Sequence, residues 1–316
     1  MYLDKTVAVV VPCHNEEKLL ADVVRTMPYF VDRIIVVDDN SEDLTGEVAQ
    51  SFVEQQPGRV ELIALRPNQG VGGAIAAGYK RARDLEMDVT VVMAGDGQMD
   101  PADLHRIVEP VATGQAAYTK GNRLFRGESW KVIPKYRYLG NSALSLMTKI
   151  ASGYWNIADS QSGYCAISLV ALKRLNLDGI YKRYGMPNDM LIKLNINNFK
   201  VRDVSVRPVY GIGERSGIRL RKVIPTISWL LAKGFCRRMV EKYVIRDFHP
   251  LIFFYFLGLT ATPIGLLSGA WLLFYRLFLG PVAATSALFS AFLIMTGMQT
   301  LFFAMWFDME YNKELR

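Results

Sequence analysis

Two long apolar runs without a charged residue, 251–274 and 282–307, most constrain how this chain of 316 residues can fold. Each run exceeds the roughly 20 residues that an α-helix needs to cross a bilayer. Because the connection between them is short, both ends of the pair must lie on the same side of the membrane. We therefore expect a C-terminal two-helix transmembrane hairpin, since uncharged runs of this length are unusual in soluble proteins.

Basic residues gather before the hairpin, in a chain whose net charge is +7. In segment 219–246 they alternate with apolar residues such as Trp229, as in an amphipathic helix lying on a membrane. This placement favours an anionic membrane surface or an anionic ligand over nucleic acid, for which the sequence carries no motif. Because lysine and arginine favour the cytosolic side, we expect an integral membrane protein whose N-terminal part is cytosolic. The predicted divisions are a folded domain 1–218, amphipathic interface helices 219–247, the hairpin 248–308 and a cytosolic tail 309–316.

The first part of the chain alternates apolar, β-branched runs with helical patterns, which is typical of an α/β fold. We expect strands at 6–12, 33–37, 60–65 and 89–93, with helices at 14–27, at 44–55 and up to residue 85. This alternation predicts a mostly parallel, doubly wound sheet. The polar loops all follow strands, so we expect them to meet in one crevice at the C-terminal edge of the sheet.

The loop after the fourth predicted strand is a small acidic turn that contains Asp96 and Gln98. A carboxylate and an amide oxygen two residues apart can ligate a hard cation such as Mg²⁺ or Mn²⁺. The alternative is a surface turn before a helix that Asp100 caps, with Pro101 at its first position. The turn alone does not distinguish these two interpretations.

The loop 68–74 is rich in glycine and superficially resembles a dinucleotide fingerprint. It follows the third strand rather than the first, and it lacks the acidic residue expected after a following strand, which argues against an NAD site. We expect its glycines to permit close approach of the backbone to a nucleotide and tight packing of a helix.

Together these motifs resemble glycosyltransferase family two, with its nucleotide-sugar-binding GT-A fold, and in particular the dolichyl- and polyprenyl-phosphate sugar synthases. The resemblance runs from about residue 6 to 216 and so ends before the hairpin. The hairpin itself fits the membrane-anchored members of that group. The matching segments are Pro12-Cys13-His14-Asn15-Glu16-Glu17, Asp38-Asp39-Asn40-Ser41, Asn68-Gln69-Gly70-Val71-Gly72-Gly73-Ala74 and Asp159-Ser160-Gln161-Ser162-Gly163-Tyr164.

The resemblance implies a role for individual residues. Asp96 and Gln98 would hold the metal, and Arg123 would act near the reacting phosphates. Arg137 would meet a lipid phosphate, and Asp189 is the one candidate for a base on the acceptor side. The residues implied to hold the nucleotide sugar are Pro12, His14, Glu16, Val37, Asp39, Asn68, Gly70, Gly73, Ala94, Gly95 and Asp96.

Three departures from the family pattern affect this assignment. Ala94 stands where the family's metal motif usually has a first aspartate, and Cys165 replaces the usual arginine after Tyr164. The late basic loop of the family is also replaced. Its phosphate-binding roles would then pass to Arg215, with Ser216, or to Arg219 or Arg221.

The sequence thus predicts an inverting, metal-dependent hexosyltransferase that moves a sugar from a nucleotide-diphosphate donor, with UDP favoured over GDP, to a polyprenyl phosphate. The alternatives are another lipid or lipid-linked glycan acceptor, or a catalytically weak membrane scaffold. Small and polar residues of the second apolar run, such as Ser290 and Gly297, can pack within the hairpin or between protomers of a homo-oligomer.

Overall fold

The computed structural model describes residues 1–124, 135–207, 209 and 220–316, with the backbone alone at 135–139, 141 and 220–223. The described residues form two compact units. One comprises Met1–Phe235 with Leu315–Arg316, and the other comprises Cys236–Glu314. The boundary expected at residue 218 falls outside the described residues, so the finer division of the chain remains a prediction.

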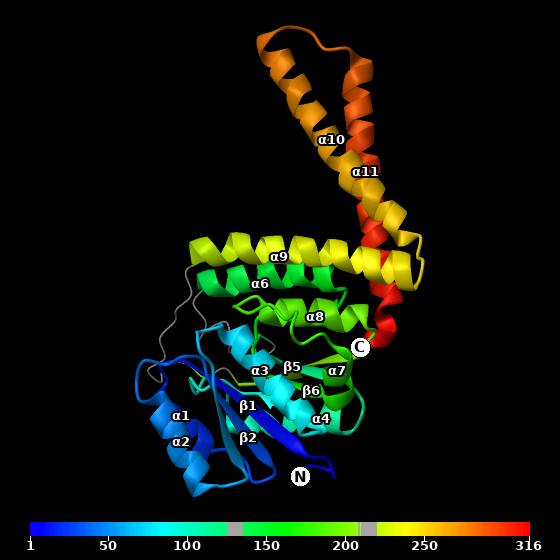
Figure 1. Ribbon diagram of the computed structural model, residues 1–316. Coiled ribbons are helices and arrows are strands. Elements are labelled where there is room, and N and C mark those ends of the chain that lie inside the picture. Colours follow the sequence, from blue (N-terminus) through cyan, green and yellow to red (C-terminus); the bar gives the residue numbers. More distant parts are fainter. Residues whose placement is uncertain (125–134, 208, 210–219) are drawn as a thin grey trace. The chain divides into compact units, whose positions relative to one another are not determined.

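The described part of the first unit is built on a sheet that includes the strands labelled β1, β2, β5 and β6 in Figure 1. The sheet has seven strands in the order β3-β2-β1-β4-β6-β5-β7. Neighbouring strands in this sheet are parallel except at β6, which is antiparallel to both β4 and β5. The predicted mostly parallel α/β sheet is therefore confirmed. The strands are β1 Val7–Cys13, β2 Arg33–Asp38, β3 Val60–Ala64, β4 Val89–Val92, β5 Tyr118–Asn122, β6 Cys165–Ser168 and β7 Val201–Ser205.

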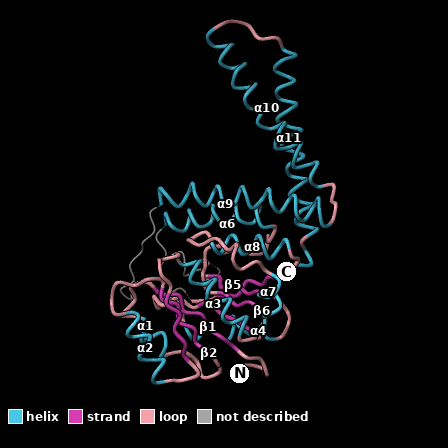
Figure 2. Tube along the Cα trace, in the orientation of Figure 1, coloured by secondary structure: helices cyan, strands magenta, loops and turns pink. Residues whose placement is uncertain are grey.

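Helices cover both faces of this sheet (Figure 2). Alternate residues of a strand point to opposite faces, so β1 contributes to two separate cores. Val7, Val9 and Val11 pack with α1, α2 and α4, whereas Ala8 and Val10 pack with α3, α7 and α8. These helices are α1 Leu20–Arg25, α2 Thr45–Gln55, α3 Val71–Asp84, α4 Leu104–Ala112, α7 Leu169–Arg174 and α8 Met186–Ile196.

Two further helices, α6 (Lys135–Ser152) and α9 (Leu220–Val240), run side by side (Figures 1 and 2). Ile227 and Leu231 of α9 form an apolar cluster with Ala151 of α6 and Ile192 of α8. The opposite side of α9 leaves Trp229 73% exposed. An apolar side chain is thus exposed on this side of α9. The assignment of α9 as an amphipathic interface helix remains a prediction.

The reversed strand β6 determines which loops meet. Because β6 is antiparallel, its first residue, Cys165, pairs with Val92 and Lys120 near the ends of β4 and β5. The turn that leads into β6, 159–164, consequently lies at the same edge of the sheet as the loops that follow the parallel strands. A topology of parallel strands alone would have put this turn at the opposite edge.

The helix expected at 14–27 begins later than predicted, since α1 spans only Leu20–Arg25. Asn15 has a φ of +59°, in the left-handed region that does not fit a helix. Its backbone N–H donates to Ser41 Oγ at 3.0 Å, and its side-chain oxygen accepts from the Glu42 N–H at 2.9 Å. Contacts with a loop far along the chain therefore replace the first helical turns.

The second unit contains two helices that are long and apolar enough to cross a membrane, α10 (Leu251–Phe278) and α11 (Ala284–Tyr311). In the most apolar 18-residue stretch of α10, 28% is buried, and in that of α11, 17% is buried. These shares are low for the core helices of a soluble protein. Gly258 faces Leu301 and Gly297 faces Thr262 so closely that an added Cβ would clash. Ser290 donates to the Gly265 carbonyl at 2.8 Å. The small residues of α11 thus pack within the hairpin, the first of the two alternatives.

A fully buried ion pair joins the end of α9 to the end of α11. Arg238 donates from its two terminal nitrogens to the oxygens of Asp308, at 2.7 and 3.0 Å, and both side chains are 0% exposed. Tyr243, in the π-helical segment Glu241–Arg246, donates its hydroxyl to Asp308 Oδ1 at 2.6 Å. Asn312 donates to the same oxygen at 3.0 Å, so the buried carboxylate has several donors.

Candidate active site

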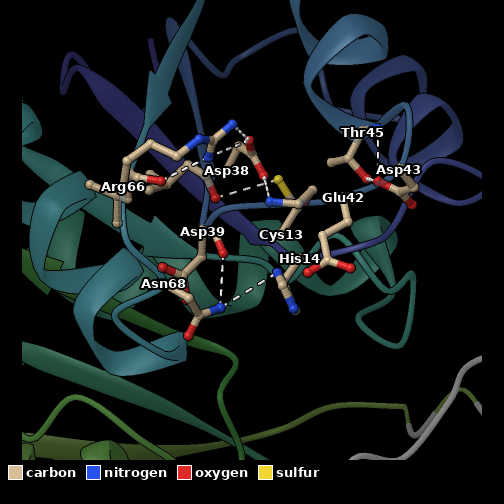
Figure 3. A network of polar contacts seen from close by, with 12 residues as sticks. Cys13, His14, Asp38, Asp39, Glu42, Asp43, Thr45, Arg66 and Asn68 are labelled. Carbon is tan, nitrogen blue, oxygen red and sulfur yellow. Dashed lines mark hydrogen bonds and ion pairs between the residues drawn. The ribbon is translucent and has the colours of Figure 1, made fainter.

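The loops after β1, β2 and β3 meet around Asp39, which is 3% exposed (Figure 3). Its two carboxylate oxygens accept from the backbone N–H groups of Gln69 and Gly70, each at 2.7 Å. Asn68 donates through Nδ2 to the Asp39 carbonyl at 2.9 Å, and the same nitrogen lies 3.5 Å from His14 Nδ1. The structure thus brings together four predicted nucleotide-binding residues. The Asp39 carboxylate also holds the loop after β3 in place through its hydrogen bonds to Gln69 and Gly70.

Pro12 and Val37 are neighbours across β1 and β2, and both are buried. The Val37 side chain belongs to the core beneath α3, and its carbonyl accepts from Cys13 Sγ at 3.4 Å. Because the side chain is enclosed, a contact between Val37 and a nucleoside has to involve the backbone.

Glu16 lies at the same edge, where its backbone N–H donates to Thr45 Oγ1 at 2.8 Å. Burial raises the pKa of Glu16 to about 7, and the negative charges of Asp96 and Asp43 add to the effect. The first, second and fourth loops therefore bring carboxylates close enough to repel one another. An edge with this excess of negative charge suits a cationic ligand.

The glycine-rich loop 68–74 packs against the backbone of Tyr181 and Lys182. The backbone N–H groups of Gly72 and Gly73, at the start of α3, donate to the Lys182 carbonyl at 2.9 and 3.2 Å. A Cβ on Gly70 would lie 2.5 Å from the same oxygen, and one on Gly72 would lie 2.1 Å from the Tyr181 carbonyl. The tight packing expected of these glycines is confirmed, whereas the roles of Gly70 and Gly73 in holding the nucleotide sugar remain predictions. The N–H groups of Gly72 and Gly73 already have a protein acceptor.

The acidic turn after β4 packs directly against the end of β1. The Gly95 N–H donates to the Pro12 carbonyl at 3.1 Å. Gln98 donates its N–H to Asp96 Oδ1 at 3.1 Å, with Gly97 between them at a φ of +70°. Asp96 and Gln98 therefore lie in one tight turn next to the end of β1. Their role as metal ligands remains a prediction.

Asp100 ends the turn as a helix cap, because its Oδ1 accepts from the Ala102 N–H at 2.8 Å. The expected first carboxylate is absent, and the Ala94 N–H donates to Met99 Sδ at 3.3 Å. Among the described residues, no group of three or more His, Cys, Asp or Glu side chains is placed to hold a metal ion. The donor set fits a cation such as Mg²⁺ or Mn²⁺ that keeps water and substrate oxygens as its other ligands.

Arg123, just after β5, is 26% exposed and pairs with the fully buried Asp159. Its Nε lies 2.8 Å from Asp159 Oδ2, and one terminal nitrogen lies 3.3 Å from Oδ1. Since β6 is antiparallel to both β4 and β5, those two strands run in the same direction, and Arg123 follows β5 at the same edge as the turn that contains Asp96. The turn before β6 brings Asp159 to this edge, and the action of Arg123 on phosphates remains a prediction.

The other predicted phosphate-binding residues are less fully placed. Arg137 lies in α6, and its side chain is outside the description. Arg215 and Ser216 fall outside the described residues, so their roles remain predictions.

Asp189, the candidate base, lies in the first turn of α8 and is mostly buried. One of its oxygens accepts from the Tyr181 N–H at 2.9 Å and also from Lys193 Nζ. Lys193 in turn donates to the Gly179 carbonyl at 2.5 Å. These contacts give Asp189 a structural task, fixing the turn before α8, that the sequence did not reveal. Its role as a base remains a prediction.

Two buried charged groups at this edge were missed. Asp38 is 2% exposed and pairs with Arg66, which follows β3, at 3.3 Å (Figure 3). Lys120 is fully buried and donates to the Ser162 carbonyl at 2.5 Å. A lysine inside a short strand was the available signal for Lys120. No local pattern links Asp38 to Arg66.

The sequence model of glycosyl transferase family 2 matches residues 8–175, which is more than half of the chain and covers β2 to β6 and all but the first residue of β1. The chain belongs to glycosyl transferase family 2. Family membership confirms the resemblance read from the loop motifs and establishes the protein as a glycosyltransferase.

Two relatives of this family 2 glycosyltransferase show where the similarity lies. The UDP-N-acetylglucosamine–dolichyl-phosphate N-acetylglucosaminyltransferase of Methanococcus voltae is 32% identical over 219 residues, which are 66% of this chain and 87% of the relative. The undecaprenyl-phosphate mannosyltransferase of Micrococcus luteus is 31% identical over 190 residues, which are 59% of this chain and 76% of the relative.

A solved structure agrees with the GT-A fold expected for this glycosyltransferase. Glucosyl-3-phosphoglycerate synthase from Mycobacterium tuberculosis, in complex with Mn²⁺, UDP and phosphoglyceric acid, superposes with a TM-score of 0.55 at 21% identity. The match covers 74% of this chain and 78% of the synthase. At this level of identity the comparison bears on the fold alone.

Proposed function

We propose that this protein transfers a sugar from a nucleotide-diphosphate donor, preferentially a UDP-sugar, to a polyprenyl phosphate at the cytosolic face of a membrane. The observation that carries the proposal is the convergence of the loops around His14, Asp39, Asp96 and Arg123 at one edge of the sheet, in a chain with two apolar helices long enough to span a bilayer. The relatives named for transfer to dolichyl and undecaprenyl phosphate support the acceptor class.

The proposed chemistry follows from the charge that develops on the leaving group. As the anomeric C–O bond breaks, the nucleoside diphosphate gains negative charge, which Arg123 stabilises from the edge of the sheet. An acceptor phosphate is largely ionised at pH 7, because its second pKa is about 6, so it can attack without giving up a proton to the enzyme. Direct attack inverts the configuration at the anomeric carbon. Asp189 is then free to serve the fold.

A divalent cation fits the proposed reaction. Asp96 and Gln98 would hold it together with the diphosphate oxygens, and it would act as a Lewis acid on the leaving group. The Mn²⁺ and UDP named for the mycobacterial synthase support this choice of cofactor, with Mg²⁺ as the equivalent ion. Ala94 removes one protein ligand, so we propose that more of the coordination comes from substrate and water.

The membrane arrangement is part of the proposal. The hairpin α10–α11 would anchor the enzyme, and α9 with its exposed Trp229 would lie at the headgroup level, where an acceptor phosphate is found. The basic residues before α10 support a cytosolic active site. Contacts between small residues use part of the hairpin for packing within the chain, so we do not extend the proposal to an oligomer.

One assay tests the proposed function. Membranes that contain the protein are incubated with labelled UDP- and GDP-sugars and polyprenyl phosphate, with and without EDTA. We expect a mild-acid-labile lipid-linked sugar from a UDP donor, and we expect EDTA to prevent its formation. Label found in an alkali-stable glycolipid would indicate that the acceptor is another lipid and not a polyprenyl phosphate. Absence of transfer from every donor would favour a scaffold.

A matched pair of variants tests the metal assignment. Asp96→Ala should lower transfer by about 10²-fold or more, because it removes the carboxylate proposed to hold the metal. Asp100→Ala removes a carboxylate from the same turn but only a helix cap, so it should cost about 1 kcal/mol of stability and leave transfer near the wild-type rate. Equal turnover in both variants would refute the assignment.

A further inference from the structure

Asp159 is a buried carboxylate that the proposed chemistry does not use directly. It opens the turn before β6, which the reversal of that strand brings to the catalytic edge. The Asp159 side chain is 0% exposed, and an isolated charge at such a position is costly unless it is paired and hydrogen-bonded. Its partners therefore indicate what this carboxylate is kept for.

The main partner of Asp159 is the guanidinium of Arg123. Two nitrogens of Arg123 bind the two oxygens of Asp159, at 2.8 and 3.3 Å, and the Arg123 backbone N–H lies 3.3 Å from Oδ2. A planar guanidinium held by two oxygens cannot rotate as a freely extended side chain does. The Arg123 side chain remains 26% exposed, so the protein does not enclose it completely.

The carboxylate that holds Arg123 is itself fixed. Oδ1 of Asp159 accepts from the backbone N–H groups of Gln161 and Ser162, at 3.1 and 3.2 Å. The buried Lys120 closes the same turn by donating to the Ser162 carbonyl at 2.5 Å. Burial acts to raise the pKa of Asp159, but the charges of Arg123 and Lys120 outweigh it and lower the pKa. The carboxylate is therefore ionised under ordinary conditions and is set rigidly in its turn.

We propose that Asp159 is a positioning residue, which orients the Arg123 guanidinium in advance toward the diphosphate leaving group. The inference rests on the proposed function, in which Arg123 stabilises the charge of that group. An arginine side chain loses about 2 kcal/mol of rotamer freedom when it is fixed. Because Asp159 fixes the guanidinium before substrate binds, the entropy of the side chain is lost during folding and not during catalysis. The N–H dipoles of Arg123 are then already aligned for the transition state.

The test is a double-mutant cycle in the full-length protein, reconstituted with its acceptor lipid. Asp159→Asn keeps an acceptor oxygen for the turn but loses the charge that holds Arg123. We expect it to lower kcat about 10- to 100-fold, with the KM of the donor changed less than about threefold. Arg123→Gln should lower kcat by about 10²–10³-fold. In the double variant, loss of Asp159 should cost no further activity, because it acts through Arg123. Additive losses would overturn the proposal.

Two further variants separate positioning from general damage to the fold. Asp203→Asn changes another buried carboxylate beside β5, which binds Asn122 instead of Arg123, and it should leave kcat near the wild-type value. Arg123→Lys keeps the charge but cannot make the two-pronged contact, so it should lose nearly as much activity as Arg123→Gln. Near-normal activity in Arg123→Lys would refute the claim that orientation matters, even if Asp159→Asn does not fold.

Calorimetric measurement of UDP binding tests the positioning role of Asp159 separately from the proposed function. UDP carries the leaving-group charge in full, so Asp159→Asn should weaken its binding about 5- to 10-fold in the wild-type background. In the Arg123→Gln background the same change should have no effect. If the wild-type protein transfers no sugar, the proposed function fails, and this comparison still supports or overturns the positioning role.

Discussion

Replacing Asp308 by alanine should open the base of the hairpin, because it leaves the Arg238 guanidinium buried without its carboxylate. Both side chains are 0% exposed, and the change removes two hydrogen bonds of 2.7 and 3.0 Å. The Tyr243 hydroxyl also loses its acceptor at 2.6 Å. Breaking a buried ion pair by removing one partner typically costs about 3–5 kcal/mol. The local opening equilibrium should therefore rise by about 10²–10⁴-fold, at roughly 1.4 kcal/mol for each factor of ten.

Hydrogen exchange followed by mass spectrometry, on the full-length protein in detergent, measures this opening directly. The reporting amides are those of Asp247 and His249, which donate to carbonyls of the π-helical segment at 3.0 and 3.1 Å. Their exchange should accelerate by the same 10²–10⁴-fold if the segment opens as one unit. The hairpin helices themselves should keep their protection, since their packing contacts lie elsewhere.

Two controls make the result decisive. Glu310→Gln breaks an exposed pair with Lys313 near the same helix end, and it should cost less than about 1 kcal/mol. A double variant, Arg238→Met with Asp308→Leu, removes both charges and should restore most of the protection, because no unpaired charge remains. Exchange within about threefold of the wild-type rate in Asp308→Ala would refute the reasoning that this pair holds the segment closed.

Three further results are expected. Burial holds the pKa of Asp203 at about 6, above its ordinary 3.8, so the folded state binds a proton more tightly than the unfolded chain. Stability of the first unit should therefore fall as pH rises from about 4 to 6, and Asp203→Asn should flatten this part of a thermal-melting profile. Gly78→Ala should destabilise the same unit by about 1–3 kcal/mol in denaturant unfolding, since the added Cβ would lie 2.2 Å from Val10 Cγ1; an unchanged midpoint would contradict this. An impermeant maleimide should label the exposed Cys236 only from the cytosolic side. In a Cys236→Ser background, the variant Leu279→Cys should be labelled only from the other side, since Leu279 is exposed at the end of α10. Labelling of both positions from one side would overturn the proposed topology.

The sequence predicted the parts of this protein that depend on local pattern. β-branched runs located β1 to β4 within one or two residues, and the uncharged runs located both apolar helices. The polar residues after β1, β2 and β4 were correctly expected to meet, because parallel strands end at one edge.

What the sequence did not predict depends on contacts between distant residues. The late start of α1 follows from the bond between Asn15 and Ser41, and the occupied start of α3 follows from the Lys182 carbonyl. The pairing of Asp189 with Lys193, one helical turn later, was likewise not predicted. The reversal of β6, which brings Asp159 beneath Arg123, requires knowledge of strand order that no short motif carries.

The two hydrogen bonds from Gly72 and Gly73 to the Lys182 carbonyl have a consequence for engineering donor and acceptor preference. They tie loop 68–74, which lies beside Asp39, to the segment that leads into α8. A chimera that joins residues 1–100 of a relative to the remainder of this chain would cut across that tie. The missing Cβ atoms of Gly70 and Gly72 and the path of Tyr181–Lys182 have to be inherited together. Recombination that respects this coupling should exchange segment 179–186 along with loop 68–74, as a single cassette.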